Sequence, residues 1–194
     1  DQGEGDYLSS IPLDLSGIPA AQQATIYLSF YWQAGGKAEV PDSNDRLTLQ
    51  ILTPGGTWLN IWEKRGGTAV DRNRFIQETI AIRPEWLHAN FQFRFFSNGR
   101  QSGPFDSWLL DYVYLNSKRS STDLSYPDRA LTQRTTVRLG DFGAYPWELL
   151  QKNQKGKWST AKSEFQNLEN RFKAMEYSVT LRDSSGVSML PINS

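Results

Sequence analysis

The segment TIYLSFYWQ, at residues 25–33, decides the fold class. Its even-numbered positions, from Ile26 to Trp32, are all large and apolar, whereas every odd-numbered position carries a hydroxyl or an amide group. Successive side chains of a β-strand point to opposite faces of the sheet, so this period of two predicts a strand with one buried face. The two tyrosines on the other face predict that part of that face is also covered or contacts a partner.

The same alternation recurs along the chain, separated by clusters of turn-forming glycine, proline and asparagine. No segment before residue 120 has a convincing helical period. The pattern therefore predicts an all-β fold with two packed antiparallel sheets over residues 1–116. A shorter entry strand is expected at residues 11–15, and no opening strand is visible before residue 6. The other strands are expected at residues 46–52, 58–62, 75–82, 91–96 and 108–115.

The sequence changes character after residue 116. Residues 117–172 predict an irregular, partly helical connector, with one helical turn at residues 146–151 and a short strand at residues 134–139. Apolar residues at i, i+3 and i+7 predict a short amphipathic helix at residues 163–172.

The last segment, residues 173–194, alternates on both sides of the turn-forming sequence DSSG and predicts a terminal β-hairpin. A hairpin alone is marginal in water. It therefore either docks on the sandwich or begins a second β domain, and the second alternative is favoured.

The composition excludes several classes of site. The chain has 194 residues, no cysteine and one histidine, which excludes disulfides, thiolate metal sites and multi-histidine zinc sites. Its 21 basic and 21 acidic side chains cancel, which argues against a dedicated nucleic-acid-binding protein. No stretch approaches the roughly 20 apolar residues of a membrane-spanning helix. The start at Asp1, without a signal sequence, is typical of a processed or excised piece.

The arrangements of residues typical of hydrolases are missing, and the chain is therefore expected not to be an enzyme. Glu78 stands alone on its strand, so the sequence lacks the paired carboxylates of a glycoside hydrolase. His88 has no Gly-x-Ser-x-Gly nucleophile motif to act with, and we interpret it as a surface histidine.

Asp111 is the most informative polar residue. In the strand expected at residues 108–115 it shares the presumed core face with Leu109 and other apolar residues. A buried carboxylate needs a hydrogen bond, an ion pair or a metal. The favoured interpretation is that Asp111 accepts hydrogen bonds from backbone amides or pairs with Arg94 or Arg46.

The alternative for Asp111 is a structural calcium site. Calcium binds oxygen ligands from carboxylates and backbone carbonyls. The expected calcium ligands are Asp45, Asp106 and Asp111, with Asp42 as a further contributor from the same loop as Asp45. No other cofactor is expected.

The aromatic content is high, with 7 Trp, 8 Tyr and 10 Phe, or 13% of the chain. Exposed aromatic rings stack on sugar rings and also anchor protein interfaces. Packing within the protein or against a protein partner is favoured over sugar binding. The residues expected to form such an aromatic platform are Tyr31, Trp58, Trp62, Trp108, Tyr112 and Tyr114.

Two pairs of segments resemble a known family. LSFYWQAGG at residues 28–36 and DRLTLQ at residues 45–50 resemble the start of a MAM-like or concanavalin-like jelly roll. FQFRF at residues 91–95 and WLLDYVYL at residues 108–115 are similar to its closing strands. The aromatic-rich form is most similar to modules of exported cell-surface proteins of Bacteroidota, some of them associated with gliding motility and type IX secretion. The resemblance covers about residues 6–116.

The resemblance implies a two-sheet antiparallel jelly roll and a non-catalytic role outside the cytoplasm. The leading hypothesis is an exported module that mediates protein–protein contacts at a bacterial cell surface, as an accessory of an outer-membrane, type IX secretion or gliding assembly. The expected location is the cell surface, the outer membrane or the periplasm. The alternative hypothesis is a carbohydrate-binding module with a structural calcium. The expected partners are other cell-envelope proteins or glycans, and neither nucleic acid nor a transmembrane segment is expected.

Overall fold

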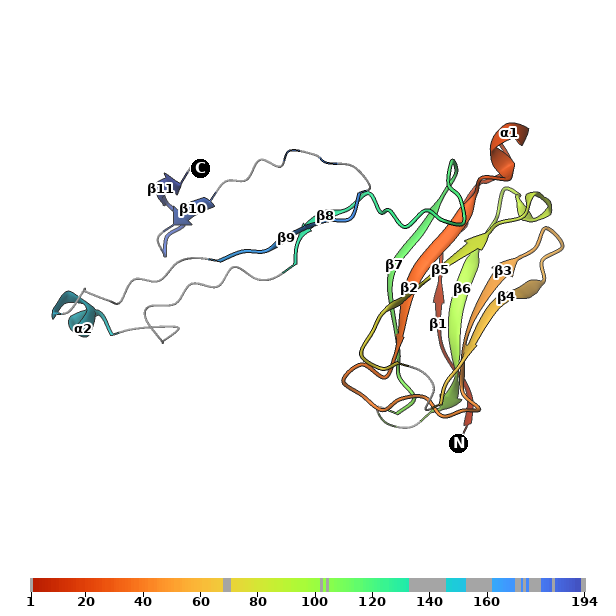
Figure 1. The fold of residues 1–194 in the computed structure, drawn as a ribbon, viewed down its shortest axis with the longest axis horizontal. Helices are drawn as coiled ribbons and strands as arrows, with labels where there is room; N and C mark the ends of the chain where they lie inside the picture. Colours follow the sequence, from red (N-terminus) through yellow and green to blue (C-terminus); the bar gives the residue numbers. More distant parts are fainter. Residues whose placement is uncertain are drawn as a thin grey trace. The chain divides into compact units, whose positions relative to one another are not determined.

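Two antiparallel β-sheets form the first part of the chain in the computed structural model. The structure describes residues 2–67, 71–101, 103, 105–132, 146–152, 162–169, 172, 174, 179–182 and 184–192. In the three-stranded sheet, β2 (Tyr27–Ala34) lies between β5 (Ile76–Ala81) and β7 (Trp108–Asn116). The four-stranded sheet has the order β1 (Gln2–Ser9), β6 (Phe93–Arg100), β3 (Arg46–Leu52) and β4 (Trp58–Arg65) (Figure 1). The prediction of a mostly β protein with two antiparallel sheets is confirmed.

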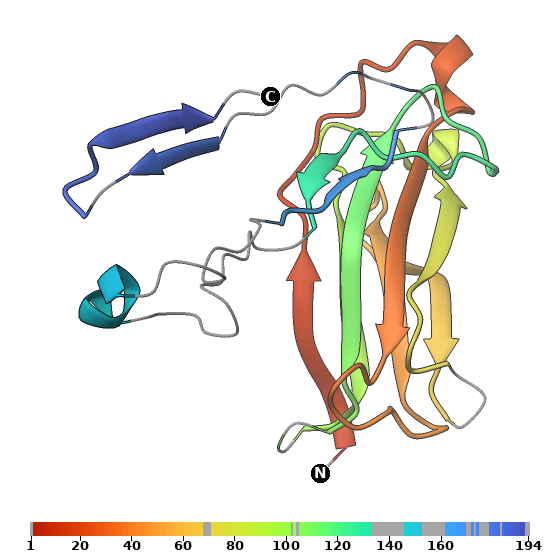
Figure 2. The same cartoon turned by 60° about the vertical axis from the view of Figure 1, so that its left-hand side comes forward.

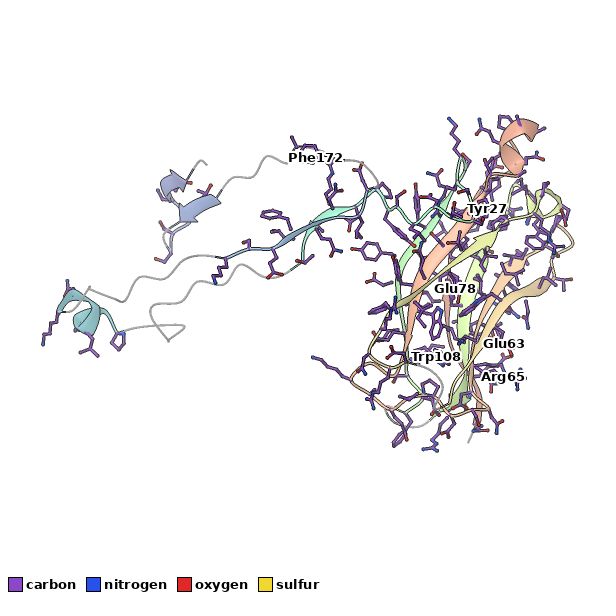
Figure 3. The ribbon with its side chains drawn as sticks, in the orientation of Figure 1. Tyr27, Glu63, Arg65, Glu78, Trp108 and Phe172 are labelled. Carbon is purple, nitrogen blue, oxygen red and sulfur yellow. The ribbon has the colours of Figure 1, made fainter. Side chains whose placement is uncertain are left out.

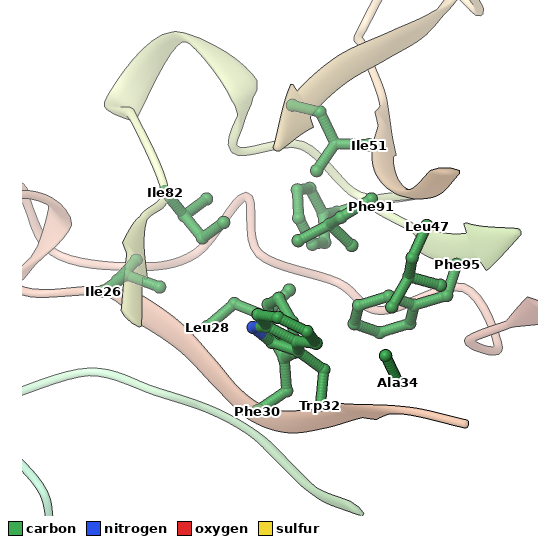
Figure 4. Packing of buried hydrophobic residues seen from close by; sticks show 11 residues of the cluster. Ile26, Leu28, Phe30, Trp32, Ala34, Leu47, Ile51, Ile82, Phe91 and Phe95 are labelled. Atoms are coloured by element: carbon green, nitrogen blue, oxygen red, sulfur yellow. The ribbon is translucent and has the colours of Figure 1, made fainter. Parts of the chain in front are cut away.

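The two sheets enclose one hydrophobic core, in a β-sandwich-like arrangement (Figure 4). From β2 come Leu28, Phe30 and Trp32, each at most 1% exposed. The ring centroid of Phe30 lies 4.8 Å from that of Phe95 and 5.1 Å from that of Trp62, both in edge contacts. The even-numbered face of β2 is therefore the inner face, as its period predicts. Burying one such side chain contributes about 1.5–3 kcal/mol to stability.

The first strand, β1, was not expected from the sequence. It pairs antiparallel with β6, with a bulge between Glu4 and Tyr7. Its sequence, QGEGDYLS, lacks apolar alternation because this edge strand buries little of either face. The expected entry strand at residues 11–15 is instead a loop with one isolated bridge, between Leu13 and Phe91.

A bulge in β7 changes which of its residues face the core. Ser29 pairs with Tyr114 and Tyr31 pairs with Asp111, so β7 has one residue more than β2 between these pairs. Tyr112 adopts a φ of 47° at this point. Such an extra residue shifts the alternation by one, and it allows both Leu110 and Leu115 to pack against the core. The prediction that one continuous odd-numbered face is buried is therefore wrong for Leu109, Asp111 and Val113, which are exposed.

The first compact unit comprises Asp1–Leu124. Arg119 attaches the segment after β7 to the three-stranded sheet: its Nη1 donates to the carbonyl oxygens of Tyr114 at 3.0 Å and Tyr27 at 3.3 Å. Its Nε donates to Asp123 at 2.9 Å. The unit also contains two short helical segments, α1 (Ala20–Gln23) and the 3-10 turn η1 (Pro84–Trp86).

The second compact unit comprises Ser125–Ser194. It contains α2 (Trp147–Lys152), the pair of β8 (Arg129–Leu131) with β9 (Phe165–Asn167), and the hairpin of β10 (Val179–Arg182) with β11 (Ser188–Ile192) (Figure 2). None of the helices within the described ranges is long and apolar enough to cross a membrane.

Two of the predictions for this second part are confirmed and one is wrong. The helical turn near residues 146–151 and the terminal hairpin are present. The amphipathic helix expected at residues 163–172 is absent from its described part, residues 163–169 and 172, because residues 165–167 pair with β8 as strand β9. The strand expected at residues 134–139 lies outside the described residues.

Candidate ligand-binding face and acidic cluster

The six residues of the predicted aromatic platform lie in three different places. Trp62 and Trp108 pack against the core, with ring centroids 6.2 Å and 5.9 Å from that of Trp32. Trp58 lies on the outer face of the four-stranded sheet, and its pairing partner on the neighbouring strand β3 is Leu52. The other three lie on the outer side of β2 and β7, and we call them the tyrosine face: Tyr31, Tyr112 and Tyr114. No single platform is formed.

The outer face of the four-stranded sheet carries a hydrogen-bonded row of polar side chains. Since Leu49 and Ile51 point into the core, Gln50 between them points outward. It lies opposite Asn60 on β4 and opposite Arg94 on β6. The amide of Gln50 donates from Nε2 to Asn60 Oδ1 at 2.6 Å and accepts at Oε1 from Arg94 Nε at 2.7 Å. These bonds fix three side chains across three strands.

Aromatic rings hold the guanidinium of Arg94. Its Cζ lies 4.0 Å from the ring centroid of Trp58 and 4.4 Å from that of Tyr7. Tyr7 in turn stacks on Phe96 with centroids 5.2 Å apart, and its hydroxyl donates to Glu4. That hydrogen bond raises the pKa of Tyr7. A planar guanidinium stacks well on aromatic faces, so Arg94 is held in one orientation. We call this surface the Arg94 face; it consists of Tyr7, Gln50, Trp58, Asn60 and Arg94.

Only Trp58 of this face was singled out from the sequence as a ligand-binding residue. Tyr7 and Arg94 meet because β1 pairs with β6, and β1 was not predicted. The alternation of Phe93, Arg94 and Phe95 does mark Arg94 as an outward-facing residue. Its neighbours follow only from the register of four strands.

A second candidate site is the acidic cluster, which consists of Asp42, Asp45 and Asp106. Each residue offers a carboxylate oxygen within 4.8 Å of the others. Asp45 is 1% exposed and Asp106 is 8% exposed. Asp45 Oδ2 accepts the backbone N–H of Asp42 at 2.7 Å, and Asp106 Oδ2 accepts that of Arg100 at 2.8 Å. Gly99 leaves space for the pair, since a Cβ there would lie 3.2 Å from Asp106 Cβ and 3.3 Å from Asp45 Cγ.

The electrostatics of the acidic cluster favour a bound cation. Burial raises the pKa of Asp45, and the nearby carboxylate of Asp106 raises it further, against the opposing hydrogen bond from the Asp42 amide. Among the described residues, the one ion pair to this cluster is that of Arg100, whose Nη2 lies 3.8 Å from the exposed Asp42. Hard oxygen donors at this spacing fit calcium. Asp106 also helps to line a pocket of about 390 Å³.

Asp111 does not belong to this cluster. Its side chain is exposed on the outer side of β7, and its Oδ1 accepts the backbone N–H of Tyr112 at 2.8 Å. The prediction that Asp111 is buried is wrong because the β7 bulge moves it away from the core. The two arginines suggested as its partners contact residues of the four-stranded sheet instead: Arg94 binds Gln50, and Arg46 Nη1 lies 3.4 Å from Glu63.

The two residues considered for catalysis make structural contacts. Glu78 Oε1 accepts a hydrogen bond from Trp32 Nε1 at 3.2 Å. His88 Nε2 lies 3.0 Å from the carbonyl oxygen of Leu52, and its ring lies edge-on to Phe91.

The tyrosine face is partly apolar. The rings of Tyr31 and Tyr112 meet edge-on with centroids 6.1 Å apart, and Arg119 Cζ lies 4.6 Å from the Tyr114 centroid. On the same strand, the side chains of Leu109 and Val113 are 40% and 38% exposed. An apolar surface with tyrosines and an arginine is typical of a protein interface.

Comparisons of the chain with protein-family models and with curated proteins found no match. The resemblance to MAM-like jelly rolls therefore rests on the quoted segments alone.

Proposed function

We propose that the chain is a non-catalytic carbohydrate-binding module of an exported bacterial protein, and that the Arg94 face binds the sugar. The observation that carries this proposal is the arrangement of Trp58, Arg94 and Gln50, which places an aromatic ring, a guanidinium and an amide side by side. Aromatic rings pack on the apolar faces of sugar rings, and amides and guanidinium groups bind the hydroxyls.

Because of this geometry, we place carbohydrate binding ahead of the protein-contact hypothesis that the sequence favoured. A sugar site needs polar groups that are fixed before the ligand arrives, since this lowers the entropy lost on binding. On the Arg94 face, hydrogen bonds hold Gln50 and Asn60, and two rings hold Arg94. Trp58 remains partly exposed beside them.

The acidic cluster supports the second half of the proposal, a structural calcium. Asp42 and Asp45 precede β3, and Asp106 precedes β7, so a cation bound by them would connect the two sheets. The same proposal includes the finer fold, a MAM-like jelly roll, and a location at the cell surface, the outer membrane or the periplasm.

The proposal is tested by titrating the chain with soluble polysaccharides and following tryptophan fluorescence. We expect at least one glycan to change the emission of the wild-type chain and Trp58→Ala to abolish binding. Leu59→Ala is the matched control, because Leu59 is the next residue on the same strand, pairs with the inward-facing Ile51 and is 40% exposed. A glycan array without any bound sugar would contradict the proposal.

The tyrosine face favours the second candidate function, a protein–protein contact within a cell-envelope assembly such as a type IX secretion or gliding complex. Its supporting observation is the exposed Leu109 on β7, the strand that pairs with β2 at Tyr31. We expect Leu109→Asp to abolish co-purification with a defined envelope protein while Trp58→Ala leaves it intact. The reverse pattern would assign the contact to the Arg94 face.

A further inference from the structure

The guanidinium of Arg94 has hydrogen-bonding groups that the protein does not use. Its Nε donates to Gln50 Oε1, and its plane contacts the rings of Trp58 and Tyr7. Within the described ranges, its two Nη groups form neither a hydrogen bond nor an ion pair. An arginine guanidinium carries five N–H donors, of which the four on the Nη atoms are available here.

Two carboxylates on the same side of the sheet as Arg94, those of Glu63 and Glu4, contact other residues. Glu63 lies 3.4 Å from Arg46 and 3.6 Å from Arg65, and the side chains of Glu63 and Arg65 extend from β4 (Figure 3). The carboxylate of Glu4 accepts a hydrogen bond from the hydroxyl of Tyr7. The strand register places Arg46, Arg65 and Arg100 on the same side of the sheet as Arg94. Of these four arginines, Arg94 alone lacks an ion pair with a carboxylate among the described side chains.

We infer that the ligand of the Arg94 face is an acidic glycan, in which the carboxylate of a uronic acid binds the Nη groups of Arg94. This inference rests on the proposed function and specifies its class of sugar. A carboxylate is planar and accepts two parallel N–H bonds from a guanidinium, so its geometry fits an arginine that is held in one plane. The sugar ring of the same residue then lies within reach of Trp58, and its hydroxyls within reach of Gln50 and Asn60.

The fixed orientation of Arg94 distinguishes this site from ordinary surface arginines. Arg83 provides the comparison: its Cζ lies 5.1 Å from the Trp86 ring, but it is exposed and lies 3.8 Å from Glu85. Arg83 therefore has a neutralising partner and only one aromatic contact, whereas Arg94 has two aromatic contacts and no acidic partner among the described side chains.

The experiment measures the affinity of the full chain for a short oligogalacturonide, for its carboxyl-reduced neutral counterpart and for a sulfated oligosaccharide, by calorimetry at fixed ionic strength. We expect the uronate to bind about 10-fold more tightly than the reduced sugar, as charge-assisted hydrogen bonds require. Arg94→Gln is expected to remove this preference, and Arg94→Lys to retain only part of it, since lysine cannot form the planar pair. Arg83→Gln is the matched control and is expected to retain the full preference. Circular dichroism of each variant checks that it is folded.

The outcomes separate the inference from the proposed function. Equal binding of the uronate and the reduced sugar would overturn the inference and leave carbohydrate binding intact. The inference would also be overturned if the folded Arg94→Gln variant kept the preference for the uronate over the reduced sugar. It would be overturned as well if the sulfated oligosaccharide bound more tightly than the uronate. Binding of a polyglutamate peptide without binding of any sugar would overturn both, and would assign the Arg94 face to an acidic protein.

Discussion

Asp45, which precedes β3, and Asp106, which precedes β7, bring their carboxylates together although the two strands belong to different sheets. Both side chains are buried, and Gly99 of β6 provides the space between them. Two buried carboxylates side by side repel each other unless a proton or a cation lies between them. Stability should therefore depend on calcium and on pH at this one place.

The first prediction concerns calcium. A cation that binds only the folded chain stabilises it by about 2.7 kcal/mol at a concentration 100 times its dissociation constant. We expect calcium to raise the melting temperature relative to a chelator, and Asp45→Asn and Asp106→Asn to abolish this shift. Asp111→Asn should retain the shift, because Asp111 lies exposed outside the cluster. A wild-type melting temperature that does not respond to calcium would count against the site.

The second prediction concerns pH in the presence of a chelator. The pKa of Asp45 is raised above its ordinary value of 3.8, chiefly by burial. The folded chain therefore holds this proton more tightly than the unfolded chain does. The resulting contribution to stability is fully present below pH 3.8 and is lost as pH rises through the pKa of the folded state.

We accordingly expect the stability of the wild-type chain, measured relative to Asp45→Asn, to increase as pH falls from 7 towards 4. Urea unfolding at several pH values measures this difference. The comparison with Asp45→Asn removes the contribution of the other carboxylates. If the difference in unfolding free energy between the two chains stays constant with pH, or decreases as pH falls, burial does not raise the pKa of Asp45.

The third prediction concerns the space at Gly99. A methyl group there would lie 3.2 Å from Asp106 Cβ and 3.3 Å from Asp45 Cγ, so Gly99→Ala should displace both carboxylates. We expect a loss of about 1–3 kcal/mol in the free energy of unfolding, together with loss of the calcium response. Gly17→Ala is the control, because a Cβ on Gly17 meets no atom within 4 Å. Equal stability of the two variants in urea would contradict the close approach.

The fourth prediction concerns the core between the sheets. Phe30 is fully buried and contacts the rings of Phe95 and Trp62, so Phe30→Ala should cost about 3–5 kcal/mol. Phe75→Ala should cost much less, because Phe75 is 40% exposed. Chemical denaturation of both variants measures the difference, and similar losses would show that the even-numbered face of β2 does not form the core.

How far the sequence predicts this fold depends on how much each strand buries. The bounds of β3 agree with the alternation at residues 46–52, and the inner face of β2 agrees with its even-numbered positions. β1 was missed because an edge strand with two glycines buries almost nothing. The prediction of a helix at residues 163–172 was wrong although the segment has apolar residues at helical spacing. Residues 165–167 pair with β8 instead, and the local spacing does not reveal this pairing.

The candidate sites could likewise be predicted from the sequence only in part. Asp45 and Asp106 were chosen as loop carboxylates from the sequence, and the structure places them together with Asp42. Asp111 was assigned to the wrong face because a single extra residue in β7 reverses the alternation. No local pattern indicates that Arg94 meets both Tyr7 and Trp58, because the three residues lie on three strands.

The sequence by itself determined the class of the fold and the inner face of its central strand, because a period of two depends only on which side chains leave water. It also determined what the chain lacks, since composition alone excludes thiolate and multi-histidine sites. The tertiary structure decided the strand order, the bulge in β7 and the neighbours of Arg94. These depend on hydrogen bonds between backbones far apart in the chain, which leave no periodic signal in either strand. The aromatic residues that first marked a single platform are thereby divided among the core, the tyrosine face and the Arg94 face.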